Sequence, residues 1–166
     1  MPTITHRGAA LFVTLAAAAA LGAALASERW GGLVPCALCL LERWPYRAAI
    51  LLGLAAAISP PRVAYVLLML LVVALLVAAG LAFVHVGVEQ TWWPSPLPEC
   101  AAPHLATGGP IAERLAHLPA RPAKPCDEPT YLITVLPISM AAMNLIYAGA
   151  LTLALAAFLL TSRGKP

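Results

Sequence analysis

The chain has 166 residues, of which 61% are hydrophobic and only 10% are charged. About a quarter of the residues in soluble domains are charged, so this composition excludes an ordinary soluble domain and favours a membrane protein. The formal net charge is +3, and the basic residues lie in ones and twos between apolar runs. This scattered distribution argues against binding to a nucleic-acid backbone.

Four apolar segments are long enough to cross a bilayer, which takes about 20 helical residues. In chain order these segments are Ala9–Ala26, Ala37–Ile58, Val63–Val86 and Ile138–Leu160. The short link Ser59–Arg62 contains two prolines, which end one helix and begin the next, so the second and third segments form an antiparallel hairpin. We therefore predict a single all-α membrane domain over residues 1–166, built as a four-helix transmembrane bundle.

The segment Gly87–Pro137, between the third and fourth predicted helices, differs in composition from the rest of the chain. It holds many of the prolines and most of the acidic residues, so we expect it to be a long extracytoplasmic loop. The basic residues on the other side of the membrane favour cytoplasmic termini by the positive-inside rule. These residues are Arg7, Arg62, Arg163 and Lys165. Ala24–Ala26 also has the form of a signal-peptidase site, and cleavage there would leave the loop on the same face.

Cys36 and Cys39 form a C-x-x-C pair at the start of the second predicted helix. The helix dipole and the free N–H groups at a helix N-terminus stabilise a thiolate, which is the reactive form of cysteine. The alternatives are two small apolar side chains in a helix, or a zinc or copper site. A metal site needs further ligands, and no histidine or second C-x-x-C lies nearby in the sequence. Leu40 follows the motif where haem attachment requires histidine.

Cys100 and Cys126 both lie in the predicted loop. A purely structural disulfide is one interpretation, because it would restrict a long loop that has little core of its own. The other interpretation is a second redox pair on the same membrane face as the C-x-x-C motif. Disulfides exchange through mixed disulfides, so two neighbouring pairs can pass electrons from one to the other.

Two ionisable residues fall inside the second predicted helix. The uninterrupted apolar part, Ala48–Ile58, is too short to cross alone, so the span must extend back through Arg43 and Glu42. Such residues usually mark a functional site or a buried ion pair. Helical spacing predicts that Arg43 shares a face with Cys39 and Cys36, where it could stabilise a thiolate or bind a quinone carbonyl. The alternative for Arg43 is snorkelling to the headgroups.

His85 lies near the outer end of the third predicted helix and is followed by Glu89, Trp92 and Trp93. A histidine at this depth could donate a hydrogen bond or a proton to a lipid-soluble electron acceptor, and a capping or packing role is the alternative. We expect both tryptophans to be anchors at the membrane interface. Glu89 is expected to face water.

With these residues in place, the chain resembles the DsbB family of bacterial membrane disulfide-generating proteins. The stretch Pro35–Arg43 is similar to the family's C-x-x-C motif with its quinone-contacting arginine, and His85–Pro96 followed by Cys100 resembles the corresponding family segment. The layout of helices and cysteines matches over nearly the whole chain. After Cys126 the chain departs from many relatives, because Tyr131 stands where they carry tryptophan.

The resemblance implies an order of electron flow. Cys100–Cys126 would be the disulfide presented to a DsbA-like periplasmic thioredoxin-fold oxidase, with Cys100 forming the mixed disulfide. Electrons would then reach Cys36–Cys39 through a Cys36–Cys126 disulfide. Cys39 would pass them to ubiquinone or menaquinone. The residues that would contact the quinone are Arg43, His85 and Glu42. The resemblance also implies a multi-pass protein of the bacterial inner membrane whose active face is periplasmic.

Three rival functions are considered. The vitamin K epoxide reductase-like proteins perform similar chemistry in a four-helix bundle, but their C-x-x-C lies on the last helix, so the order of cysteines argues against them. A membrane metal-binding protein could hold a soft ion between Cys36 and Cys39. The third rival is a non-enzymatic scaffold with structural disulfides. It predicts that Cys36→Ser leaves quinone-dependent thiol oxidation intact.

Overall fold

The computed structural model describes residues 6–100, 124–132 and 136–162, and the regular secondary structure within them is helical, with no strand. The middle of the predicted loop therefore lies outside the described residues. The helical elements are α1 (His6–Arg29), α2 (Ala37–Leu41), α3 (Arg43–Ile58), α4 (Pro61–Glu89), the 3-10 turn η1 (Pro98–Cys100) and α6 (Met140–Ser162).

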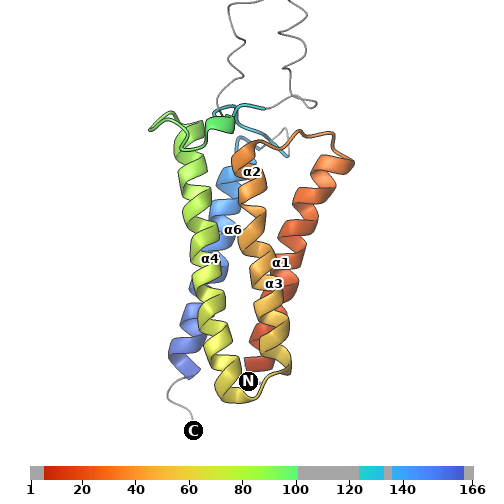
Figure 1. Cartoon of the computed structure of the whole chain (residues 1–166), viewed down its shortest axis with the longest axis vertical. Coiled ribbons are helices and arrows are strands. Elements are labelled where there is room, and N and C mark those ends of the chain that lie inside the picture. The colour runs from red at the N-terminus through yellow and green to blue at the C-terminus, as the bar shows by residue number, and fades with distance from the viewer. Residues whose placement is uncertain (1–5, 101–123, 133–135, 163–166) are drawn as a thin grey trace, which may run out of the picture.

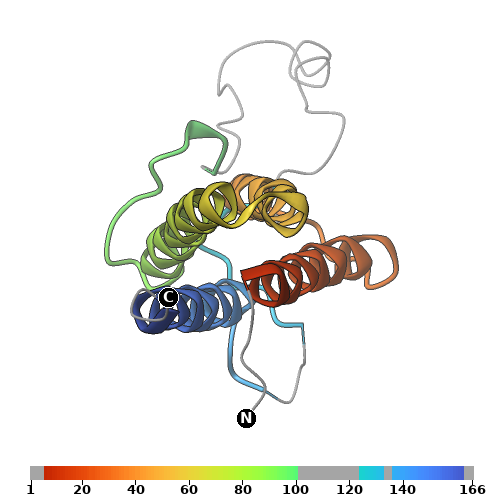
Figure 2. The same ribbon diagram turned by 90° about the horizontal axis from the view of Figure 1, so that it is seen from below.

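The four long helices α1, α3, α4 and α6 stand side by side (Figures 1 and 2). The closest packing is between α1 and α3, between α3 and α4, and between α4 and α6, whereas α1 and α6 touch much less. The α3–α4 turn lies at the same end of the bundle as the start of α1 and the end of α6. The opposite end, which we call the site end, carries α2 and η1.

The interior of the bundle contains many small side chains, and this allows close contact between helix backbones. Ala10, Ala17, Ala49 and Ala78 are fully buried in the main apolar cluster. α1 and α3 approach closely at Gly53, where a Cβ atom would lie 2.1 Å from Thr14 Oγ1 on α1. The predicted helical bundle is thus confirmed for the described residues.

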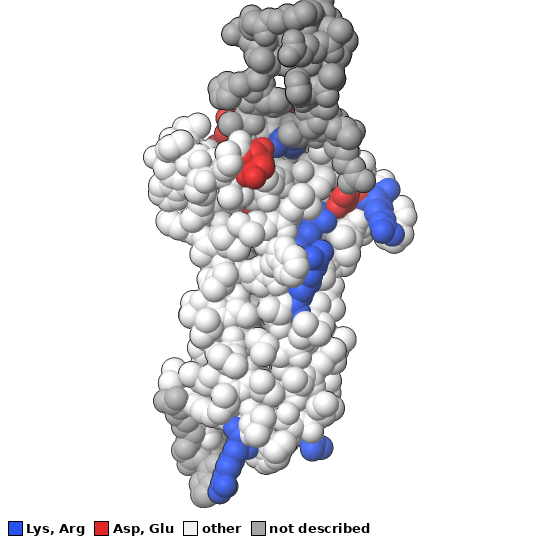
Figure 3. Space-filling model, in the orientation of Figure 1, with Lys and Arg blue, Asp and Glu red and all other residues white. Residues whose placement is uncertain are grey.

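The outer surface of the bundle is apolar in its middle. Large apolar side chains that are exposed include Phe12, Leu15, Leu51, Leu76 and Leu153. Charged side chains gather towards the two ends in the space-filling view (Figure 3). Within the described residues, three helices, α1, α4 and α6, are long and apolar enough to cross a membrane. Exposed apolar area of this extent is expected in lipid, so the chain is a multi-pass membrane protein.

The second predicted helix, Ala37–Ile58, is not one regular helix in the structure. It is interrupted at Glu42 and divided into α2 and α3. Pro45 explains the interruption, because it has no N–H to donate to the Leu41 carbonyl and its ring crowds that carbonyl. Neither α2 nor α3 alone has the roughly 20 residues that a helix needs to cross the bilayer.

The other three predicted helices are correct in position, and their ends differ by two or three residues. The fourth is shifted rather than short, because it runs over Met140–Ser162 instead of Ile138–Leu160. The first extends to His6 and Arg29 rather than stopping at Ala9 and Ala26. The third continues to Glu89, so the segment after it begins three residues later than predicted. The charged and polar residues at these ends lowered the apparent hydrophobicity without ending the helix, because helix ends at a membrane surface can solvate polar groups.

Candidate functional site

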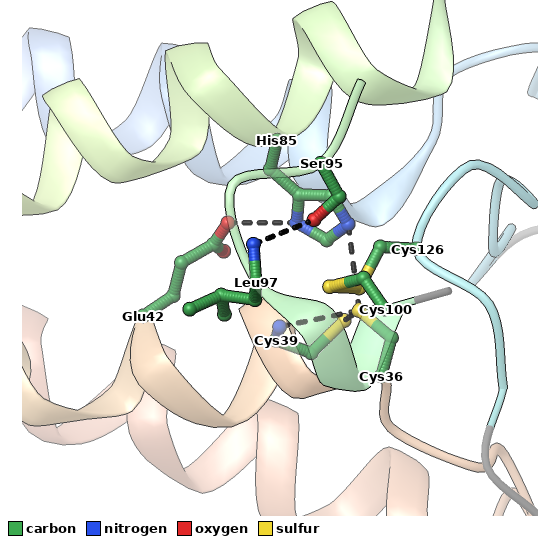
Figure 4. The surroundings of a disulfide bond; sticks show 8 residues. All are labelled: Cys36, Cys39, Glu42, His85, Ser95, Leu97, Cys100 and Cys126. Carbon is green, nitrogen blue, oxygen red and sulfur yellow. Dashed lines mark hydrogen bonds and ion pairs between the residues drawn. A yellow bond between two sulfur atoms is a disulfide. The ribbon is translucent and has the colours of Figure 1, made fainter. Parts of the chain in front are cut away.

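The two cysteine pairs meet at the site end of the bundle. Cys36, Cys100 and Cys126 are buried in one cluster, against which Cys39 packs. Cys100 and Cys126 form a disulfide, while Cys36 and Cys39 are free thiols whose sulfurs lie 2.9 Å apart (Figure 4). This juxtaposition supplies the contact that thiol–disulfide exchange between the pairs requires.

Cys36 is the N-cap of α2 rather than a residue inside the helix. Its sulfur accepts a hydrogen bond from the Cys39 backbone N–H at 3.2 Å. The hydrogen bond between the two sulfurs lowers the pKa of the Cys36 thiol, and this outweighs burial, which acts in the opposite direction. An ionised Cys36 is stabilised because the Cys39 thiol donates to it. In this geometry the better-stabilised thiolate is Cys36, whereas the resemblance makes Cys39 the residue that passes electrons to the quinone.

His85 on α4 lies directly beside Cys36. Its Nε2 atom is 3.5 Å from Cys36 Sγ, and its Nδ1 atom is 2.7 Å from Glu42 Oε1. The imidazole is 3% exposed and thus lies between a thiol and a carboxylate, away from water (Figure 4). A cysteine, a histidine and an orienting carboxylate in this order are the elements of an activated nucleophile.

In the sequence analysis the lack of a histidine near the C-x-x-C motif argued against a metal site. In the structure His85 lies next to this motif. His85 is 49 residues from Cys36 in sequence. The hairpin formed by α3 and α4 returns the chain to the site end, so the last turns of α4 lie next to α2 (Figure 1). The sequence-based objection to a metal site, the lack of a further ligand, is therefore wrong.

Glu42 connects three helices. Besides the contact with His85, its Oε2 atom accepts a hydrogen bond from Asn144 Nδ2 on α6 at 2.7 Å. Asn144 Oδ1 in turn accepts from the Tyr46 hydroxyl on α3 at 2.5 Å. Glu42 is 7% exposed, and these contacts satisfy a carboxylate that would otherwise be costly to bury. The sequence left two interpretations of Glu42, a functional site and a buried ion pair. Its contacts with His85 and Asn144 fit both.

Arg43 is buried at the start of α3 and forms an ion pair with Glu28 of α1, with 2.8 Å between Nη1 and Oε2. Its Nε atom is buried without a hydrogen-bond partner among the described residues. Arg43 and Cys39 line the same cavity, and Cys36 does not. The prediction of one shared face therefore describes Cys39 and Arg43 but not Cys36, because Cys36 precedes the helix.

The cavity has a volume of about 340 Å³ and is lined mainly by residues of α1, α3 and α6 near the site end. Most of its wall is apolar, with Leu21, Leu33, Val34, Met140 and Met143 among the lining residues. Its polar lining includes Cys39, Glu42, Arg43, Tyr46, His85 and Asn144. A mostly apolar cavity with a few convergent polar groups is typical of a site for a small apolar molecule.

The family model described as disulfide bond formation protein DsbB matches residues 6–158. The chain belongs to the DsbB family. It is therefore a membrane protein of disulfide bond formation, and the free thiol pair beside a disulfide is consistent with that function. No curated protein and no solved structure shows a significant match to the chain.

Trp93 is a residue of this DsbB-family site that the sequence pattern misassigned. It was expected to be an interface anchor together with Trp92, which is 60% exposed. Trp93 instead folds back onto α4, donates from Nε1 to the Val84 carbonyl at 3.1 Å and packs against the cysteine cluster. Gly87 makes room for it, because a Cβ atom there would lie 1.9 Å from Trp93 Cζ2. The feature of the sequence that could have indicated this packing is Gly87, six residues before Trp93.

Glu89 also differs from its expected role as a water-facing residue. Its Oε2 atom accepts a hydrogen bond from the Ser139 hydroxyl at 2.5 Å, and Ser139 Oγ accepts from the Ala142 backbone N–H at the start of α6. Glu89 therefore joins the end of α4 to the start of α6. Asn144, Tyr46 and Glu28 were likewise not identified as site residues from the sequence, because none belongs to a local motif.

Proposed function

We propose that this DsbB-family protein is a thiol:quinone oxidoreductase of the bacterial inner membrane. It reoxidises a DsbA-like periplasmic thioredoxin-fold oxidase and passes the electrons to ubiquinone or menaquinone. The observation that carries the proposal is the position of the C-x-x-C pair. Cys36 lies in the cluster with Cys100 and Cys126, while Cys39 lines the apolar cavity together with Arg43.

The proposal includes a fourth membrane crossing by α2 and α3 together. Residues 37–58 span about 33 Å at 1.5 Å per residue, which is enough to cross the hydrocarbon core. The cytoplasmic end is then the one that carries Arg7 and Arg62, in accord with the positive-inside rule. The site end, with both cysteine pairs, faces the periplasm.

The first step is exchange with the partner. A thiolate of the reduced partner attacks Cys100, the Cys100–Cys126 bond breaks, and Cys126 is released as a thiolate. The second thiol of the partner then attacks the mixed disulfide, so the partner leaves oxidised and Cys100 is reduced. Two electrons and two protons have moved from the partner to the Cys100/Cys126 pair.

The second step moves the electrons inward. Cys126 attacks Cys36 of an oxidised Cys36–Cys39 pair, and Cys100 resolves the resulting Cys36–Cys126 disulfide. The products are a Cys100–Cys126 disulfide and two thiols at Cys36 and Cys39, which is the pattern of bonds in the structure. His85 lies 3.5 Å from Cys36 Sγ and is placed to exchange the proton of that thiol.

The residues around the cavity fit a quinone headgroup. The volume suits a small ring, the wall is mostly apolar, and the buried Nε atom of Arg43 lacks a partner among the described residues and is available to an acceptor oxygen. When bound, the quinone supplies the oxidant, taking up two electrons and two protons and leaving as quinol. Cys36 and Cys39 close their disulfide, His85 takes the Cys36 proton, and Arg43 positions the acceptor.

The test is a quinone reduction assay with purified protein and a reduced DsbA-like partner, followed by quinone absorbance. The parent is expected to reduce quinone, and Cys39→Ser is expected to be inactive. Arg43→Ala should raise the KM for quinone, and Arg43→Lys should restore part of the loss. Absence of quinone reduction by the parent would disprove the proposed function. An unchanged KM in Arg43→Ala would remove only the role of Arg43.

A further inference from the structure

Three atoms with the chemistry of metal ligands converge beside the disulfide. Cys36 Sγ, Cys39 Sγ and a ring nitrogen of His85 lie within 4.8 Å of one another (Figure 4). Two sulfurs and one imidazole favour Zn²⁺ and similar thiophilic cations over Mg²⁺ and Ca²⁺, which prefer oxygen ligands. Cys36 and His85 are buried, so the cluster is not a chance grouping of surface side chains.

We propose that the reduced Cys36/Cys39 pair and His85 form a Zn²⁺ site that disappears when the two cysteines form a disulfide. The proposal goes beyond thiol oxidation. Metal binding by these three residues requires neither quinone nor partner, so it stands independently of the proposed electron acceptor. Its consequence for activity, described below, rests on the proposed function.

The observed distances suit a tetrahedral site. With Zn–S bonds of about 2.3 Å and a Zn–N bond of about 2.0 Å, tetrahedral angles place sulfur and nitrogen about 3.5 Å apart. Cys36 Sγ and His85 Nε2 are 3.5 Å apart. The two sulfurs, now at 2.9 Å, would have to separate to about 3.8 Å. A small rotation of one cysteine side chain achieves this separation.

Glu42 prepares the histidine for this role. Its carboxylate lies 2.7 Å from His85 Nδ1, which places the proton on Nδ1 and leaves the lone pair of Nε2 directed at the sulfurs. A carboxylate behind a histidine ligand is the usual support of zinc sites. Asn144 holds the other oxygen of Glu42 at 2.7 Å, so the support is itself fixed.

The cavity supplies access for the ion and the fourth coordination position. Cys39 and His85 line it, so a water molecule or an exogenous ligand can complete the coordination from that side. Charge is also balanced at the metal, because two thiolates offset the two charges of Zn²⁺ and the imidazole is neutral. A neutral complex suits a buried position near the membrane better than two free thiolates.

Bound Zn²⁺ would block the redox cycle at one step. Both thiols of the inner pair would be coordinated, so neither could close the disulfide until the metal leaves. Zn²⁺ should therefore inhibit the reduced enzyme and should have no effect through this site on the enzyme whose inner pair is oxidised.

The experiment uses the full chain with Cys100→Ser and Cys126→Ser, which leaves Cys36 and Cys39 as the only cysteines. Co²⁺ is added to the reduced and to the oxidised protein in detergent, and Zn²⁺ is then added as a competitor. We expect one Co²⁺ per reduced chain, with the visible bands of four-coordinate cobalt and sulfur-to-cobalt charge transfer. Zn²⁺ should abolish these bands. The oxidised protein should show none.

Variants distinguish the three-ligand site from a simple dithiol. His85→Ala should weaken Zn²⁺ binding by at least about 100-fold, and Glu42→Gln by about 10- to 100-fold. His6→Ala, at the other end of the bundle, is the matched control and should bind as the parent does. Equal binding by reduced and oxidised protein, or undiminished affinity in His85→Ala, would overturn the proposal. The redox comparison needs no change at the site, so it remains decisive even if His85→Ala does not fold.

Discussion

At the residue scale, Glu42 is the side chain on which the geometry of the inner thiol pair depends. It follows Cys39 by three residues, interrupts the α2–α3 segment and contacts both His85 and Asn144. Burial of a carboxylate at 7% exposure is favourable only when its oxygens are satisfied, and here both oxygens have partners. The residue therefore fixes the direction in which His85 presents Nε2.

Glu42→Gln tests this dependence. The amide has nearly the same shape and can still contact Asn144, but it cannot stabilise a protonated His85 or hold it as firmly. We expect the rate of quinone-dependent thiol oxidation to fall by about 10- to 100-fold, with little change in thermal stability. The exposed Glu128→Gln is the control for loss of a carboxylate. A parental rate in Glu42→Gln would show that His85 does not need this partner.

At the element scale, the last turns of α4 form the wall against which the cysteine cluster packs. Val88 lies in the cluster, His85 reaches Cys36, and Gly87 accepts the ring of Trp93. The position of the Trp93 ring thus requires a residue without a side chain at position 87 of α4. This close approach makes α4 more than a membrane span, because its end determines how deeply Cys36 is buried.

Gly87→Ala should displace the Trp93 ring. The added Cβ atom would lie 1.9 Å from Cζ2, so the ring must move, and overpacking of this kind costs about 1–3 kcal/mol. We expect a lower melting temperature in detergent and faster alkylation of Cys36. Gly80→Ala is a matched control on the same helix, since nothing lies within 4 Å of its added Cβ. Gly80→Ala should leave the melting temperature and the rate of Cys36 alkylation near the parental values. Equal behaviour of the two variants would contradict the packing role of Gly87.

At the scale of the whole molecule, charged side chains lie towards the two ends of the bundle on the face shown in Figure 3, and large apolar side chains are exposed between them. The hairpin turn between α3 and α4 lies at one end, and α2 and η1 lie at the other (Figure 1), where the cysteine cluster packs. If α2 and α3 cross the bilayer together, these two ends are on opposite sides of the membrane. Electron flow would then begin at the periplasmic face, where a soluble thiol partner can reach Cys100 and Cys126.

Labelling of single introduced cysteines tests this topology. In a background without the native cysteines, Ser59→Cys marks the α3–α4 turn and Asp127→Cys marks the site end. We expect a membrane-impermeant thiol reagent to label Asp127→Cys in intact spheroplasts and Ser59→Cys only after permeabilisation. Labelling of both positions from the same side would show that α2 and α3 do not form a fourth span.

The helical content, the approximate positions of the helices and the two cysteine pairs could be predicted from composition and spacing. Long apolar runs specify helices because a bilayer leaves no other way to satisfy the backbone. The two prolines at 60 and 61 specified the hairpin, and the C-x-x-C-x-x-E-R stretch specified the redox motif. These features are local, so composition and spacing are sufficient to find them.

Which distant residues meet became apparent from the packing of the helices. A soluble helix reveals its buried side by its pattern of polar residues, but a helix in lipid is apolar on both sides, so the sequence of α4 did not show that His85 turns towards Cys36. The same is true of the Arg43–Glu28 ion pair and of Asn144 behind Glu42. The division of α2 from α3 follows from Pro45 but was hidden by the apolar run around it. Helix rotation and packing, rather than local pattern, therefore set the chemistry of the thiol pair.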